Sequence, residues 1–119
     1  MINEYYRERK YEKIAEIYQE EHPAAITDAD IINKVAESYR RIKRTTEAIR
    51  WLERLVEVRP ERRHLERLCE LYLQVETSKD AWKRLRDASE GKSRECVAVA
   101  SYFVAKAEGA GTARLEATL

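Results

Sequence analysis

Apolar side chains recur every three to four positions along most of the chain, a spacing that predicts amphipathic α-helices. In residues 28–43 the apolar positions are Ile31, Ile32, Val35, Ala36, Tyr39 and Ile42. A second segment follows directly, with Ala48, Ile49, Leu52, Leu55 and Val56. Pro60 ends it, because proline disfavours helix at the residue before it. We therefore expect two helices joined by a short turn at residues 43–45.

Residues 61–75 repeat the first kind of segment, and a fourth segment runs from Ala81 to Ala88. Gly91 follows it, where a left-handed residue favours a helix end. The expected N-terminal caps are Thr27 with Asp30, then Thr45 or Thr46, and then Thr77 or Ser78.

The apolar positions recur at a fixed offset. Those of the first pair move by 33 residues onto those of the second: Ile32, Val35, Ala36, Tyr39, Ala48, Leu52 and Leu55 become Leu65, Leu68, Cys69, Tyr72, Ala81, Leu85 and Ala88. Moved back by 34, Tyr39, Ala48 and Leu52 fall on Tyr5, Ile14 and Tyr18. A two-helix unit with this period indicates a helical repeat array.

At these positions the chain resembles the tetratricopeptide repeat (TPR) family. The residues that carry the resemblance are Ile32-x₂-Val35-Ala36-x₂-Tyr39, Ala48-x₃-Leu52, Pro60, Leu65-x₂-Leu68-Cys69-x₂-Tyr72 and Ala81-x₃-Leu85. The resemblance implies an all-α fold, a right-handed α-solenoid of antiparallel helix pairs with about three repeats plus a C-terminal helix. In this single domain, 1–27 form a partial repeat, 28–60 and 61–92 full repeats, and 93–119 a C-terminal helix and tail.

Residues 94–108 carry apolar or small side chains on nearly every face. We expect Ser93 to cap this helix and Gly109 to end it, with residues 112–119 forming a short second helix. One interpretation packs the helix on the preceding repeat, covered by the tail. The other leaves an apolar face to join a partner or another copy, and this possible oligomer face comprises Val99, Tyr102 and Phe103.

The formal net charge is +1, so no global field attracts nucleic acid or an anionic surface. No apolar run approaches the roughly 20 residues of a membrane span, and the first ten residues lack the apolar core of a signal peptide. Cys69 and Cys96 lie inside helical patterns, which favours free thiols and a cytoplasmic protein.

The sequence contains little that indicates catalysis. Neither His22 nor His64 has a second ligand at a useful spacing, so no metal site is predicted. There is no glycine-rich phosphate loop and no nucleophile motif, and the carboxylates alternate with Arg and Lys as on solvated helix faces. We predict a non-enzymatic protein with no cofactor and no small-molecule substrate.

In the TPR family the first helix of each repeat lines a groove that holds a peptide or a partner helix. Carried over to this chain, the groove residues in the prediction are Asn3, Arg7, Asn33, Lys34, Glu37, Arg40, Arg41, Arg63, Arg67 and Glu70. A subgroup of the family grips a C-terminal carboxylate, and Asn3 and Arg67 match its pattern. Arg63 stands in place of a lysine of that pattern, and Lys34 in place of an asparagine.

The predicted function is a non-catalytic protein-interaction module, an adaptor, scaffold or assembly-factor domain, whose groove binds a peptide or partner helix, acidic ones included. One alternative is a structural module that self-associates through the apolar residues 96–107. Another is weak nucleic-acid binding through the Arg-rich joints near Arg44 and Arg59.

Overall fold

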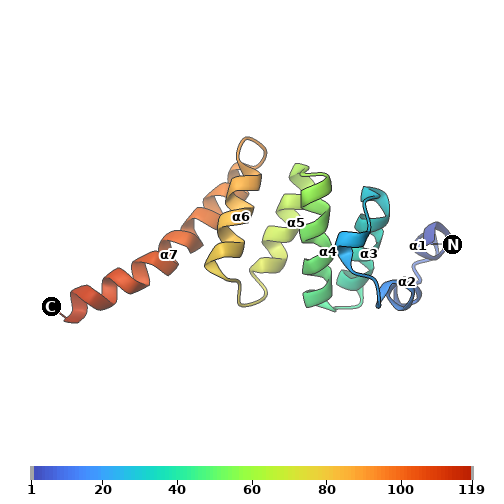
Figure 1. The fold of residues 1–119 in the computed structure, drawn as a ribbon, viewed down its shortest axis with the longest axis horizontal. Helices are drawn as coiled ribbons and strands as arrows, with labels where there is room; N and C mark the ends of the chain where they lie inside the picture. Colours follow the sequence, from blue (N-terminus) through green and yellow to red (C-terminus); the bar gives the residue numbers. More distant parts are fainter. Residues whose placement is uncertain (1, 119) are drawn as a thin grey trace. The chain divides into compact units, whose positions relative to one another are not determined.

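The computed structural model describes the backbone of residues 2–118 and the side chains of residues 2–109, and every regular element in this part of the chain is a helix (Figure 1). The elements are α1 (Ile2–Arg7), α2 (Tyr11–Tyr18), a short 3₁₀ helix η1 (Pro23–Ala25), α3 (Ala29–Arg41), α4 (Thr45–Val58), α5 (Arg62–Tyr72), α6 (Lys79–Ser89) and α7 (Arg94–Thr118). The all-α prediction is therefore confirmed for the described residues.

The chain divides into two compact units at Pro60. Unit 1 comprises Met1–Pro60 and contains α1 to α4, whereas unit 2 comprises Glu61–Leu119 and contains α5 to α7. The division falls where α4 ends at Val58 before Pro60, as the proline in the sequence led us to expect.

Small side chains allow α3 and α4 to pack closely in unit 1. Ala36 and Ala48 are both buried, and beside them Tyr39 and Leu52 fill the interior. The Tyr39 hydroxyl donates a 3.4 Å hydrogen bond to the carbonyl oxygen of Ala15 on α2, so the buried polar tip has a partner. A single tyrosine thus joins the α3–α4 hairpin to the preceding helix.

The two helix hairpins of unit 1 reverse through the same turn, 34 residues apart. The backbone N–H of Lys10 donates to the Tyr5 carbonyl at 2.8 Å, and the N–H of Arg44 donates to the Tyr39 carbonyl at 2.9 Å. Within each turn one residue takes a left-handed conformation, Arg9 with φ 60° and Lys43 with φ 64°. The offset found between apolar positions therefore extends to backbone hydrogen bonds.

Unit 2 closes its α5–α6 hairpin through a longer loop. The Thr77 hydroxyl donates a 2.7 Å hydrogen bond to the Tyr72 carbonyl, at the position where unit 1 uses a backbone N–H. The Tyr72 ring meets the Trp82 ring of α6 edge-on, with centroids 5.4 Å apart. Leu65, Leu68 and Leu85 are buried in this unit.

Helix α7 packs on the rest of unit 2 through one apolar side. Cys96, Ala100 and Val104 are buried, and the Ser93 side chain accepts a 3.2 Å hydrogen bond from the Cys96 N–H, which confirms the predicted cap. The predicted end at Gly109 is wrong, because the helical backbone continues to Thr118. The separate second helix predicted over 112–119 is therefore absent from the described residues, and the side chains of this segment lie outside them.

The structure also corrects two helix starts. Asp28, not Thr27, caps α3, and its Oδ1 accepts hydrogen bonds from the N–H groups of Asp30 and Ile31 at 2.9 and 3.3 Å. Helix α4 begins at Thr45 after Arg44, without a side-chain cap. Ser78 caps α6 as expected, and Gly91 adopts the predicted left-handed conformation with φ 75°.

We expect Lys43→Gly to raise the free energy of unfolding by about 1 kcal/mol, because the Cβ atom of lysine strains a left-handed conformation and glycine has no Cβ atom. Urea denaturation of the purified variant measures the change. Lys43→Ala, which keeps the Cβ atom, should leave stability close to that of the parent. A Gly variant less stable than the Ala variant would show that Lys43 is not strained.

We expect Leu52→Ala to lower the free energy of unfolding by about 2–5 kcal/mol, as for other buried leucines. Ala48→Trp should be similarly harmful, since it fills the close approach of α3 and α4. Thr46→Ala, at an exposed position of the same helix, is the control. Melting curves of both core variants that match the parent's would contradict the proposed packing of this hairpin.

Candidate functional site

Predicted groove residues from α1 and α3 meet on one polar surface of unit 1. Lys34 Nζ lies 2.5 Å from Asn3 Oδ1 and 2.8 Å from Asp30 Oδ2, so one lysine contacts both helices. Its side chain is largely covered, whereas the Asp30 side chain is mostly exposed. Lys34 is therefore held in place before any ligand arrives.

Two tyrosine rings lie beneath the cations of this surface. Lys34 Nζ is 5.8 Å from the centroid of the Tyr6 ring, and the Arg41 guanidinium carbon is 5.8 Å from that of Tyr11. The two rings meet edge-on at 5.9 Å. Cations at this distance from an aromatic face are attracted to it.

Glu37 fixes the two arginines at the C-terminal end of the surface. Its carboxylate accepts a 2.9 Å hydrogen bond from Arg40 Nε, a further one from Arg40 Nη2 and a 2.9 Å bond from Arg41 Nε. We call the whole surface the α1–α3 face, which comprises Asn3, Tyr6, Tyr11, Asp30, Lys34, Glu37, Arg40 and Arg41. It carries three cations and two carboxylates, a slight positive excess.

Burial and the charges of this face shift the pKa of the Tyr6 hydroxyl. Its pKa is raised above the usual value of 10.0, chiefly by burial and then by the negative charge of Glu37. Arg41 and Lys34 act in the opposite direction. At neutral pH the hydroxyl is therefore protonated and available as a hydrogen-bond donor.

A surface hollow adjoins the α1–α3 face at Tyr11. It has a volume of about 540 Å³ and is lined by Arg9, Lys10, Tyr11, Glu12, Lys13, Glu16 and Ile42. Since Tyr11 belongs to both, a ligand on the α1–α3 face can extend into this hollow. The hollow could not be predicted from the sequence, because the α1–α2 turn that forms it depends on the left-handed Arg9.

The remaining groove residues are placed less closely together. Among the described side chains, exposed Arg7 and half-buried Asn33 form no hydrogen bond or ion pair. In unit 2, Arg63 Nε lies 3.1 Å from Glu61 Oε2, whereas half-buried Arg67 has no ion-pair partner among the described side chains. Glu70 is exposed, three positions after Arg67.

The possible oligomer face on α7 is only partly open. Tyr102 is 58% exposed, and Val99 is half-buried. The Phe103 ring stacks on the Trp82 ring with centroids 4.7 Å apart, so Phe103 contributes to packing within unit 2. Lys106 Nζ lies 5.9 Å from the Tyr102 ring centroid. The exposed aromatic surface thus centres on Tyr102.

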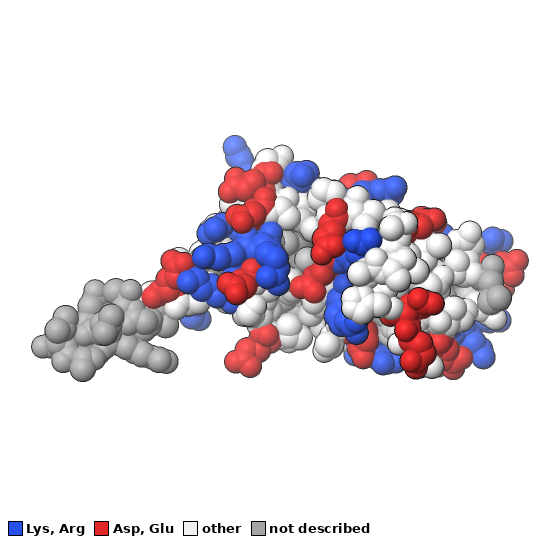
Figure 2. Space-filling view, viewed as in Figure 1, with Lys and Arg blue, Asp and Glu red and all other residues white. Residues whose placement is uncertain are grey.

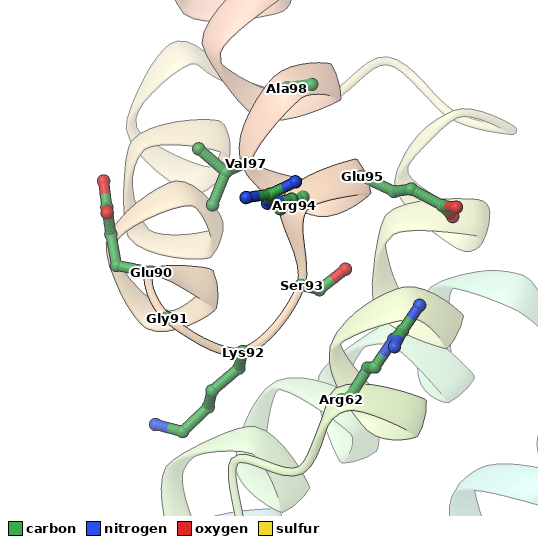
Figure 3. A pocket seen from close by; sticks show the side chains of 9 residues that line it. All are labelled: Arg62, Glu90, Gly91, Lys92, Ser93, Arg94, Glu95, Val97 and Ala98. Atoms are coloured by element: carbon green, nitrogen blue, oxygen red, sulfur yellow. The ribbon is translucent and has the colours of Figure 1, made fainter.

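Unit 2 also contains a hollow of about 720 Å³ at the start of α7, shown in Figure 3. Its charged lining residues are Arg62, Glu90, Lys92, Arg94 and Glu95. Arg62 is already paired, with its Nε 3.0 Å from Glu66 Oε2. The lining therefore carries three cations and two carboxylates. Among these described residues no buried side chain lacks a partner and points into the hollow, so the hollow is a weak candidate for a binding site.

Two general findings concern the described part of the chain. No three His, Cys, Asp or Glu side chains there lie close enough together to hold a metal ion. Within the same residues, no helix is both long enough and apolar enough to cross a membrane.

Comparison with known proteins adds no assignment. No protein-family model matches the chain, and neither the search of curated proteins nor that of solved structures found a match. The TPR resemblance therefore stays a prediction that rests on the residues quoted above.

We expect the Tyr6 environment to make stability depend on alkaline pH. Burial raises the pKa of Tyr6 in the folded protein above the value of 10.0 expected for the unfolded chain. The protonated hydroxyl therefore contributes fully to the free energy of unfolding below pH 10.0, and this contribution is lost as the pH rises through the pKa of the folded protein. Urea titrations at neutral pH and above pH 10 should therefore show a steeper loss of stability in the parent than in Tyr6→Phe. Equal losses in the two proteins would show that the hydroxyl is not perturbed.

Proposed function

We propose that the protein is a non-catalytic interaction module that binds a peptide or a protein segment on the α1–α3 face. The observation that carries the proposal is the lysine shared by Asn3 and Asp30, which lies over Tyr6 and beside the Glu37–arginine pairs. Side chains that are already ordered lose little conformational entropy on binding, which favours affinity and specificity.

The chemistry of the face indicates the class of partner. Lysine and arginine side chains favour acidic residues or a free carboxylate, and the tyrosine rings add apolar area beside them. Asn3 and Tyr6 supply neutral hydrogen-bonding groups at the same place. We therefore propose an acidic peptide segment, in keeping with the groove that the TPR resemblance implies.

We also propose that the helix pairs are arranged as in a TPR solenoid. Two hairpins that share one turn at a spacing of 34 residues support a right-handed solenoid of TPR-type helix pairs. Arg63 and Arg67 of unit 2 stay predicted groove residues on the basis of the TPR resemblance alone. The buried, free Cys69 and Cys96 are in keeping with a reducing, cytoplasmic setting.

The charge distribution gives less support to nucleic-acid binding. Arg40, Arg41 and Arg44 each have a carboxylate partner, and so do Arg62 and Arg63. Figure 2 shows Lys and Arg side chains interleaved with Asp and Glu over the face in view. Phosphate binding draws on an excess of positive surface charge.

The binding proposal is tested by first identifying a partner that co-purifies with the protein, and then measuring its affinity by calorimetry. Lys34→Gln with Arg41→Gln should weaken binding by about 2–5 kcal/mol, because both charges are lost from the α1–α3 face while a polar side chain is kept at each position. Circular dichroism checks that helicity is kept, because a loss would mean that the substitutions unfold α1 and do not merely remove charges from the face.

The matched control is Arg50→Gln with Arg84→Gln, which removes two exposed charges from α4 and α6, outside both the α1–α3 face and the adjoining hollow. Arg54 is unsuitable as a control, because its Nε donates a 3.0 Å hydrogen bond to the Ile26 carbonyl. If both pairs of substitutions weaken binding equally, the effect is one of net charge and the α1–α3 face is not the binding site. Arg63→Gln with Arg67→Gln then tests unit 2 separately.

Self-association through α7 is a second candidate function, favoured by the exposed Tyr102 ring. We expect Val99→Glu with Tyr102→Glu to convert an oligomer into a folded monomer in sedimentation experiments at tens of micromolar. Phe103 is left unchanged because it stacks on Trp82. A parent protein that already sediments as a monomer removes this candidate.

A further inference from the structure

Cys69 of α5 and Cys96 of α7 face each other within unit 2. The Ser93 hydroxyl donates a 2.9 Å hydrogen bond to Glu66 Oε2, which joins the same two helices. Cys69 and Cys96 each stand three residues, almost one helical turn, further along. Short loops join α5 to α6 and α6 to α7, so α5 and α7 run in the same direction. Both residue pairs are 27 positions apart, and the register that brings Ser93 to Glu66 therefore places Cys96 beside Cys69.

Both thiols are enclosed. Cys69 is 6% exposed and Cys96 is 1% exposed. Burial, followed by the proximity of Cys96, raises the pKa of the Cys69 thiol to about 12. Because the thiolate is the reactive form, the raised pKa makes Cys69 unreactive at neutral pH, and burial keeps oxidants in the solvent away from both sulfurs.

We propose that Cys69 and Cys96 form an oxidisable pair, which a small-molecule disulfide such as glutathione disulfide converts into an intramolecular bond between α5 and α7. The reaction takes place when the contact between the two helices opens, since neither sulfur is accessible in the closed state. Reclosing then brings the two sulfurs back together.

The exchange balances in two steps. The thiolate of one cysteine attacks a sulfur of glutathione disulfide, forms a mixed disulfide and releases one glutathione thiolate. The second cysteine, after losing its proton, attacks the cysteine sulfur of that mixed disulfide and releases the second glutathione thiolate. The protein loses two protons and two electrons, and the oxidant becomes two reduced glutathione molecules.

The new bond would close a loop between positions 69 and 96 and hold the first turn of α7 against α5. A cross-link of this kind restricts the unfolded chain and so favours the folded state. By linkage, folding must favour formation of the bond to the same extent. The bond would also keep the part of α7 that carries Val99 and Tyr102 docked.

The test is an equilibrium measurement on the full chain in glutathione redox buffers, approached from both the reduced and the oxidised protein. Acid quenching and intact mass spectrometry then give the ratio of internal disulfide to dithiol. We expect this ratio to be at least about tenfold higher in native buffer than in concentrated urea at the same redox potential. An equal or lower ratio in native buffer overturns the proposal, as does a native product that consists of mixed disulfides or linked dimers.

Single variants supply a second readout. The oxidised parent should melt several degrees above the reduced parent, whereas oxidant treatment of Cys69→Ser or Cys96→Ser should produce no such rise. The comparison of native and unfolded parent does not depend on these variants, so it decides the question even if a serine disturbs the packing. A rise of equal size in a single variant shows that the stabilisation does not come from the Cys69–Cys96 bond.

Discussion

The carbonyl group of a tyrosine at the end of each first helix sets the geometry of the hairpins. Each such helix must reverse within a few residues while its last carbonyls still need donors. Unit 1 meets this need twice with a backbone N–H five residues later, at the cost of a left-handed Arg9 and Lys43. Unit 2 uses the Thr77 hydroxyl, also five residues later, within a longer loop. The closure of the turn sets where the second helix starts, and small residues such as Ala36 and Ala48 determine how closely it packs.

Much of the secondary structure could be predicted from the local sequence, because at most helix ends only one residue is suited to start or stop the helix. The 3.6-residue period and Pro60 place α3 and α4, and Ser78 and Gly91 mark the limits of α6. The signal at the start of α3 is ambiguous, since Thr27 and Asp28 are both good caps and spacing alone does not choose between them. Gly109 shows a different limit. Its helix penalty is only about 1 kcal/mol, and an ion pair of 3.1 Å between Lys79 and Glu108 holds α7 beside α6 up to that point.

The α1–α3 face could be predicted only in part. The family pattern brought Asn3 and Lys34 to one surface, and the four-residue spacing of Glu37 and Arg41 indicates an ion pair. The ring positions of Tyr6 and Tyr11 depend on the angle between α1 and α2, which periodicity does not contain. Phe103 was predicted to lie on an outer face. Its stacking on Trp82 could not be predicted, because it depends on how α6 and α7 cross.

Helices α1 and α2 have only six and eight residues, fewer than the roughly 12–15 that an isolated helix needs to persist in water. Their order therefore derives from α3, through the Lys34–Asn3 contact and the bond from the Tyr39 hydroxyl to Ala15. This hairpin is a local folding unit templated by its neighbour, and its opening free energy is smaller than that of the whole unit. Any ligand that requires both α1 and α3 must suppress that opening. Binding of a ligand to the α1–α3 face should therefore slow amide exchange in residues 2–18, because both depend on the equilibrium between the closed and the opened α1–α2 hairpin.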